Sequence, residues 1–247
     1  MSVPNKYSMD FTLRTSDVDL TERWTLSGIM NAIQLAADSH ATLLGAGKGQ
    51  IIPKGYYWVL ARLRIDMRRY PRYGDTLTAT TWPGVPERIS FPRYFRFEDQ
   101  NGVVGTASLL YILMSAETQR FVPSAKVDIY PKDMQVHPET NPAPDKIRFD
   151  ESNRETVFRK PSYSDIDLNR HMNNTRYAQW ICDLFPTSKF ESSVLKTCQI
   201  NFVSDGVEGH SIALDHYEAA DAFVIRGTDT DNDGKTVFEC SGEWMTV

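Results

Sequence analysis

The chain has 247 residues, of which 41% are hydrophobic, 24% charged and 11% aromatic. This composition is typical of a folded globular protein and excludes collagen-like, coiled-coil and disordered classes. The formal net charge is −5 at pH 7, so no general affinity for nucleic acid or acidic membranes is expected.

The cysteines and the apolar segments indicate a cytoplasmic protein without a membrane span. Cys182, Cys198 and Cys240 are widely spaced and form no CxxC pair, so neither a disulfide framework nor a zinc site is indicated. The amino terminus lacks the basic flank and apolar core of a secretory signal. The most apolar segment, residues 107–114, is far shorter than the roughly 20 residues that cross a bilayer.

A short motif occurs twice in the chain. The sequence SDVDL at residues 16–20 returns as SDIDL at residues 164–168. Each copy leads into a segment with helical apolar spacing and then into several strand-like runs. The two halves are therefore expected to have the same architecture.

In the first half, apolar residues recur at helical spacing from Ile29 onward, after the candidate N-cap Ser27 and before the stop signal Gly45. The Asn101-Gly102 pair favours a hairpin turn between two later strands. The predicted strands are residues 57–69, 76–82, 89–98 and 103–115.

In the second half, Asn173 or Asn174 can cap a helix that carries Tyr177 and Trp180 on its apolar face and ends at Pro186. This helix is again followed by strand-like runs. The predicted strands are residues 195–203, 210–218, 222–228 and 236–246.

Prolines crowd the region between the halves and indicate an extended connector. We therefore divide the chain into an N-terminal unit at 1–135, a connector at 136–154 and a C-terminal unit at 155–247. A helix of about four to five turns followed by four antiparallel strands buries its apolar stripe against the sheet. Two such units can pair their sheets and protect the strand edges, so the sequence predicts an α+β fold built twice.

Residues 167–174 hold the strongest candidate for a chemical site. In an extended segment, Asp167, Asn169 and His171 point to one side because side chains alternate. The helix start at Asn173 or Asn174 adds free backbone N–H groups that can bind an oxyanion. The alternative is that the aspartate and the asparagines only cap the helix and form turns, as such residues often do.

The repeat favours the catalytic interpretation. The first copy has Thr21 and Arg23 where the second has Asn169 and His171. Helix capping would be needed in both halves, whereas catalysis needs only one of them.

These residues resemble a known family. The sequence DIDLNRHMNNTRY at residues 165–177 is similar to the signature of the acyl-ACP thioesterases, which include plant chloroplast enzymes and bacterial counterparts, where ACP is the acyl carrier protein. The resemblance extends over nearly the whole chain. In the first half it runs through residues 58–60, 69–75, 81–83 and 117–120.

The resemblance implies a tandem hotdog fold, in which two long helices are each wrapped by an antiparallel sheet. It assigns catalysis to Asp167, Asn169 and His171 and to an acidic residue on the strand after the helix, which our alignment places at Asp205. We expect the second half to carry the catalysis and the first half to shape the acyl pocket. The candidate substrate-binding residues are Ile33 and Ala37 on the first helix and Asn173, Asn174 and Tyr177 on the second.

The chain departs from the family pattern after the second helix. Relatives often have Glu followed by Cys where this chain has Asp205 and Gly206, so a cysteine nucleophile is excluded at that position. The chain also has no GxSxG elbow. A carboxylate can activate water or attack directly, while Asn169 and the helix amides hold the thioester oxygen.

We expect water activation on the side of Asp205 and His171 and an orienting role for Asp167. Which carboxylate is the base or the nucleophile stays open. Asp205, which precedes a glycine, is also compatible with an ordinary turn.

Five arginines alternate with apolar residues in an otherwise acidic protein. Their strand face is either a docking surface for the acidic carrier protein or a solvated face paired with acids such as Asp66. The five are Arg62, Arg64, Arg68, Arg69 and Arg72.

Two further signals favour structural interpretations. Residues 229–234 open like an EF-hand loop, but position twelve is Cys240, so a hairpin turn is favoured. His40 lies on an apolar helix face and is expected to be a buried core histidine. No metal or organic cofactor is expected.

The expected function is hydrolysis of fatty acyl-ACP to free fatty acid, which would terminate fatty acid synthesis. The alternatives are an acyl-CoA thioesterase of related fold and a non-catalytic acyl-binding hotdog protein. The sequence leaves open the acyl chain length and the oligomeric state, a homodimer included.

Overall fold

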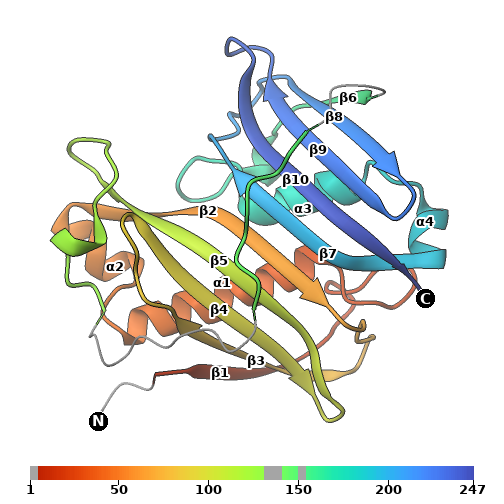
Figure 1. Cartoon of the computed structure of the whole chain (residues 1–247), viewed down its shortest axis with the longest axis horizontal. Helices are drawn as coiled ribbons and strands as arrows, with labels where there is room; N and C mark the ends of the chain where they lie inside the picture. The colour runs from red at the N-terminus through yellow and green to blue at the C-terminus, as the bar shows by residue number, and fades with distance from the viewer. Residues whose placement is uncertain (1–4, 131–140, 150–153) are drawn as a thin grey trace.

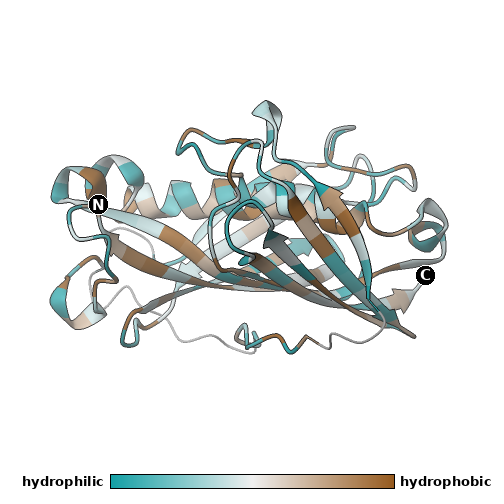
Figure 2. Cartoon of the chain, turned by 90° about the horizontal axis from the view of Figure 1, so that it is seen from above, coloured by the Kyte–Doolittle hydropathy of each residue, from teal (hydrophilic) through white to brown (hydrophobic). Residues whose placement is uncertain are grey.

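The computed structural model describes residues 5–130, 141–149 and 154–247. They form one antiparallel sheet of ten strands in the order β1-β3-β4-β5-β2-β7-β10-β9-β8-β6. The helices lie on one face of this sheet (Figure 1, Figure 2). In the described residues, no helix is long and apolar enough to cross a membrane.

Each half contributes five neighbouring strands to the sheet. The elements of the first half are β1 (Tyr7–Thr12), α1 (Leu26–Leu43), α2 (Lys48–Ile51), β2 (Tyr56–Met67), β3 (Thr76–Pro83), β4 (Ser90–Asp99) and β5 (Gly102–Ser115). Those of the second half are β6 (Glu155–Arg159), α3 (Asn174–Cys182), α4 (Thr187–Ser192), β7 (Ser193–Phe202), β8 (Ile212–Ala219), β9 (Ala222–Asp229) and β10 (Lys235–Thr246). Short 3₁₀ turns occupy Ile52–Lys54, Ser124–Lys126 and Tyr163–Asp165.

The eight predicted strands are present, and each half has one strand more than expected. The additional strands β1 and β6 form the two outer edges of the sheet. Strand β6 is short and mostly exposed, so it lacks the alternation of a half-buried strand. Strand β1 does alternate, with Tyr7, Met9 and Phe11 packed against the core, but the pattern spans only six residues. Their pairing with β3 and β8 gives the two halves the same strand order.

The two main helices differ in length. Helix α1 has 18 residues and begins after Thr25 rather than Ser27, because Thr25 Oγ1 accepts a hydrogen bond from Gly28 N at 3.0 Å. Helix α3 has nine residues and ends before the predicted stop at Pro186. Phe185 instead turns into the core against Trp244, with ring centroids 5.0 Å apart.

Strands β2 and β7 join the two half-sheets. Their register pairs Arg62 with Asn201 and continues to Asp66 with Thr197. One hydrophobic core extends beneath this junction and contains residues of both α1 and α3. The halves therefore share a core, in which α1 and α3 pack against each other.

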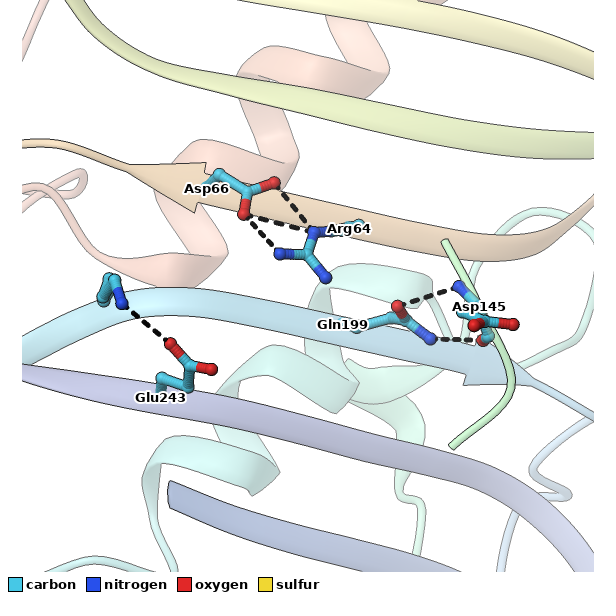
Figure 3. A network of polar contacts seen from close by, with 6 residues as sticks. Arg64, Asp66, Asp145, Gln199 and Glu243 are labelled. Carbon is cyan, nitrogen blue, oxygen red and sulfur yellow. Dashed lines mark hydrogen bonds and ion pairs between the residues drawn. The ribbon is translucent and has the colours of Figure 1, made fainter. Parts of the chain in front are cut away.

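The described part of the connector, residues 141–149, has neither helix nor strand and runs along the sheet face opposite the helices (Figure 1, Figure 2). Figure 3 shows Gln199 of β7 beside Asp145, whose backbone N–H donates to Gln199 Oε1 at 3.0 Å. Gln199 is only 6% exposed, and the connector backbone that covers it supplies the hydrogen-bond partners that its buried amide needs. The unit boundaries at 135 and 155 stay a prediction, and residue 135 lies outside the described residues.

Candidate active site

The loop before α3 is built around one carboxylate. Asp167 Oδ1 accepts from Asn169 N at 2.7 Å and from His171 N at 3.5 Å, and Oδ2 accepts from Asn169 Nδ2 at 3.2 Å. Asp167 N in turn donates to His171 O at 2.8 Å. The carboxylate thus fixes the positions of the amide and the imidazole.

The loop before α1 has the same backbone. Asp19 Oδ1 accepts from Thr21 N at 2.8 Å and from Arg23 N at 3.3 Å, and Asp19 N donates to Arg23 O at 3.0 Å. The aspartate therefore builds the loop in both halves. Only the second half places an amide and an imidazole on it.

His171 faces a second carboxylate. Its Nδ1 lies 3.5 Å from Asp205 Oδ1, and the two side chains are 52% and 65% exposed. Asp205 lies shortly after the end of β7 at Phe202. Met172 N donates to Gly206 O at 3.3 Å, which ties this segment to the loop. The structure therefore brings together Asp205 and His171, which are distant in the sequence, at an accessible surface.

Gly206 is held in a confined space by Tyr177. Gly206 N donates to the Tyr177 hydroxyl at 3.2 Å, and Tyr177 is only 3% exposed. Burial raises the pKa of this hydroxyl, so it is neutral. A Cβ at position 206 would lie 3.0 Å from the hydroxyl and 3.2 Å from Met172 Cβ, so a cysteine at this position would not fit this packing without a shift.

The two asparagines at the start of α3 have different positions. Asn173 is the N-cap, and its Oδ1 accepts from both the backbone N–H and the hydroxyl of Thr175 at 2.9 Å. Asn174 is the first helical residue, and its backbone N–H has no hydrogen bond among the described residues. This N–H can donate to an oxyanion beside the loop.

Sequence reasoning missed one residue of this group. Lys48, at the start of α2 in the first half, donates from Nζ to Asn169 Oδ1 at 2.7 Å. The contact orients the amide, because Asn169 Oδ1 then accepts while Nδ2 keeps one hydrogen for a ligand. The two residues are 121 positions apart, and no local pattern around Lys48 marks it.

The predicted acyl-pocket residues lie on the inner face of α1. Ile33 and Ala37 are 2% and 7% exposed and belong to the main core. Tyr177, the third apolar candidate, also lies in this core. Their part in acyl binding stays a prediction.

Two of the five arginines are engaged in ion pairs. Arg64 NH2 lies 2.7 Å from Asp66 Oδ1 (Figure 3), and Arg69 pairs with Asp99. These contacts use part of the positive charge within the protein itself.

The other three arginines make no ion pair among the described residues. Arg68 and Arg72 are exposed and Arg62 is half-buried. Arg72 NH1 donates to Thr21 O at 3.0 Å, so it lies beside the loop of the first half. A docking role for the five stays a prediction.

The remaining polar signals are structural. His40 is fully buried, with Nδ1 3.2 Å from Arg93 NH1. Residues 229–234 form the hairpin turn between β9 and β10, as predicted. Within the described ranges, no group of three or more His, Cys, Asp and Glu side chains is arranged to hold a metal ion.

The cysteines are poor nucleophiles. All three are free thiols, and Cys198 and Cys240 lie in the core with their sulfur atoms 3.8 Å apart. Burial raises the pKa of the Cys182 and Cys240 thiols, which disfavours the reactive thiolate.

The chain is similar to plant enzymes over most of its length. The chloroplastic palmitoyl-acyl carrier protein thioesterase of Gossypium hirsutum is 27% identical over 210 residues, 79% of this chain and 51% of the relative. The chloroplastic dodecanoyl-[acyl-carrier-protein] hydrolase of Cinnamomum camphora is 27% identical over 206 residues, 78% of this chain and 54% of the relative. The chain thus spans about half the length of these relatives.

Solved structures match the whole fold. An acyl-ACP thioesterase from Bacteroides thetaiotaomicron has a TM-score of 0.89 and 22% identity, and the match covers 98% of both chains. The 12:0-ACP thioesterase from Umbellularia californica has a TM-score of 0.86 and 21% identity, again over 98% of both. These likenesses confirm the tandem hotdog fold.

Family models cover both halves. The model of the acyl-ACP thioesterase N-terminal domain matches residues 4–130, and the model of the acyl-ACP thioesterase C-terminal domain matches residues 149–246. The chain belongs to the acyl-ACP thioesterase family.

Proposed function

We propose that the chain hydrolyses fatty acyl-ACP to free fatty acid and holo-ACP, and so terminates fatty acid synthesis. The observation that carries the proposal is the His171–Asp205 pair, with 3.5 Å between Nδ1 and Oδ1. The pair lies at the loop before α3, which has an amide and an imidazole where the loop before α1 has Thr21 and Arg23. Membership of the family supports the substrate class.

In the proposed reaction, the Asp205–His171 pair takes a proton from a water molecule, whose oxygen attacks the thioester carbonyl carbon. Negative charge moves to the carbonyl oxygen, where Asn169 Nδ2 and the Asn174 N–H donate hydrogen bonds. The carbon–sulfur bond then breaks, and the thiolate of the carrier's phosphopantetheine arm takes the proton back. The products are a free thiol and a fatty acid, which releases its remaining proton to solvent as it ionises to the carboxylate.

Direct attack by the Asp205 carboxylate is the alternative first step. It would form a mixed anhydride and release the thiol before water enters. In a single turnover in heavy-oxygen water, direct water attack always labels the fatty acid. A mixed anhydride that water opens at the Asp205 carbonyl instead gives an unlabelled fatty acid and a labelled Asp205. An unlabelled fatty acid in the first turnover would assign the attack to the carboxylate.

Release of fatty acid from a panel of acyl-ACPs tests the function, with acyl-CoAs of the same lengths in parallel. His171→Ala and Asn169→Ala should each lower kcat by about 10² or more in folded protein. Thr21→Ala, the matched change in the first half, should alter kcat only modestly.

Near-normal turnover by folded His171→Ala or Asn169→Ala would overturn the assignment of the active site. A higher kcat/KM with acyl-CoA would make CoA the carrier. Tight acyl-ACP binding without turnover would make the protein a non-catalytic acyl-binding module.

We also propose that the exposed arginines after β2 contribute to carrier docking, supported by the acidity of the carrier protein. Arg68→Glu with Arg72→Glu should raise KM for acyl-ACP severalfold and leave KM for acyl-CoA unchanged, because CoA lacks the protein surface. An equal change with both substrates would refute docking at this surface.

The acyl pocket is proposed to lie against α1. Ile33→Trp and Ala37→Phe should shift preference toward shorter acyl chains, because larger side chains fill the space for terminal methylenes. Ratios of kcat/KM on two chain lengths control for lost stability. An unchanged profile, together with a shift from changes around Tyr177 and Trp180, would move the pocket to the second half.

We further propose that the protein works in the cytoplasm. Three free thiols, two of them with sulfur atoms 3.8 Å apart, support a reducing compartment. Fractionation of the native cell tests this.

A further inference from the structure

A cleft of about 490 Å³ lies away from the proposed active site. It is lined by the loop before α1, by the end of α3 and by the segment that leads through α4 into β7. The start of α1 and the end of α3 meet here, whereas the catalytic loop precedes the start of α3. The cleft is therefore at the opposite end of the α1–α3 pair.

The cleft is the structural counterpart of the proposed active site. Trp24 N donates to Pro71 O at 3.0 Å, as Met172 N donates to Gly206 O at 3.3 Å. Tyr70, which precedes Pro71, thus corresponds to Asp205. By the same repeat, Arg23 takes the place of His171.

These replacements reverse the electrostatics of the site. A carboxylate is replaced by Tyr70, whose hydroxyl donates to Leu195 O at 2.9 Å. Burial raises the pKa of Tyr70, so it stays neutral. A titratable imidazole is replaced by Arg23, which is always cationic. The counterpart has lost the carboxylate–imidazole pair that is proposed to activate water. It carries the fixed cation of Arg23 instead, and the carboxylates of Asp19 and Asp183 also line the cleft.

Arg23 lacks the counter-charge that a buried cation requires. It is only 9% exposed, and within the described residues its guanidinium makes one hydrogen bond, from NH1 to Phe190 O at 2.9 Å. No carboxylate of the described residues lies within ion-pair distance of it. Asp19, the nearest acid in sequence, directs Oδ1 to the loop N–H groups instead.

The rest of the cleft suits an apolar chain with an anionic end. Trp24, Phe185 and Leu195 form part of its wall. Arg159 lines it too, and its Nε is buried without a partner within the described residues, although NH2 lies 3.4 Å from Asp183. A volume of about 490 Å³ is within the usual range for small-molecule pockets.

We propose that this cleft binds an amphiphile with a carboxylate head, the class to which free fatty acids belong, with the carboxylate on Arg23 and the chain against the apolar wall. The binding does not require hydrolysis. A protein that releases such carboxylates would therefore carry a separate site for its product class.

Isothermal titration with dodecanoate below its micelle concentration tests the proposal in the full chain carrying His171→Ala. Arg23→Gln should weaken binding by about tenfold or more, because the charge-assisted hydrogen bonds are lost. Gln179→Trp, which fills the cleft from α3 without changing charge, should also weaken binding. Arg72→Gln, at an exposed arginine next to the same loop, is the matched control and should leave binding unchanged.

Dodecan-1-ol, which lacks the carboxylate, should bind at least about tenfold more weakly than dodecanoate. This comparison and Gln179→Trp decide the question even if Arg23→Gln does not fold. Absence of dodecanoate binding, or binding that ignores both cleft variants, or equal binding of the alcohol, would overturn the proposal. None of these results depends on turnover of acyl-ACP, so the proposed function is tested separately.

Discussion

Asp167 and Asp19 make equivalent hydrogen bonds to the backbone in two loops that hold different chemistry. An aspartate in this position accepts from N–H groups that would otherwise be left without a partner. Its first role is therefore to shape the loop, and any catalytic effect of Asp167 arises through the neighbours that it orients.

Alanine at each aspartate separates these roles. Asp19→Ala and Asp167→Ala should both lower the free energy of unfolding by about 1 to 2 kcal/mol, because loop N–H groups lose their acceptor. Only Asp167→Ala should also lower kcat, by about tenfold or more, since Asn169 and His171 lose their orientation. Urea unfolding and steady-state kinetics measure the two effects. Equal losses of kcat would show that the loops are not functionally distinct.

Variants of Gly206 and Tyr177 test whether the Tyr177 hydroxyl restricts the space at position 206. Gly206→Ala should lower the free energy of unfolding by about 1 to 3 kcal/mol, because the added Cβ overpacks the site. In a Tyr177→Phe background the same change should be less destabilising, because the hydroxyl at 3.0 Å is gone. Gly49→Ala is the control, since a Cβ there meets nothing within 4 Å. An identical loss in both backgrounds would mean that the hydroxyl does not restrict position 206.

At the scale of elements, the two loops share a conformation that glycine favours. Arg170 has a φ of 65° and Glu22 a φ of 63°, which is the left-handed region. Arg170→Gly should leave the free energy of unfolding within about 0.5 kcal/mol, because relieved strain offsets the added freedom of the unfolded chain. Arg170→Val should lower it by about 1 to 2 kcal/mol. Thermal or urea unfolding measures both, and equal effects of Gly and Val would refute a left-handed requirement.

The predictable elements are those with local signals. Helix α1 and eight strands could be predicted because apolar periodicity and turn residues mark them within short windows. Strand β6 lacks such signals, since it is mostly exposed and exists through its pairing with β8. Strand β1 has an alternating pattern, but the pattern spans only six residues. The length of α3 also escaped prediction, because the packing of Phe185 decides where the chain turns.

The site divides in the same way. Asp167, Asn169 and His171 lie in one motif and could be predicted together from the repeat. Lys48 could not, because only the packing of the halves places it at Asn169. The match of Tyr70 with Asp205 was also hidden, since the shorter α3 breaks the constant offset of the repeat between helix and strand.

At the scale of the molecule, the shared core predicts a single unfolding transition. Ile200 of β7 is fully buried in the core that both halves share. Ile200→Ala should lower the free energy of unfolding of the entire chain by about 2 to 5 kcal/mol. Hydrogen–deuterium exchange of peptides from β4 and from β9 across a urea series measures each half. Both should unfold at the same lowered urea concentration.

The outcome that would contradict this is a β4 peptide that keeps its wild-type midpoint while β9 shifts. The halves would then unfold independently in spite of the β2–β7 pairing. Leu35→Ala, at an exposed position of α1, is the control. It should change the free energy of unfolding by no more than about 0.5 kcal/mol, so both midpoints should stay close to their wild-type values.

The duplicated loop has a genetic consequence. Two identical chains of one half each, assembled in the same way, would be encoded by one gene, and a codon change that removed the imidazole would remove it from both loops at once. Here each loop has its own codons, so mutation can alter Arg23 while selection holds His171. Covalent joining thus frees one copy to acquire a different ligand without loss of the other's chemistry. The divergence between the two loops is what such independent inheritance would produce.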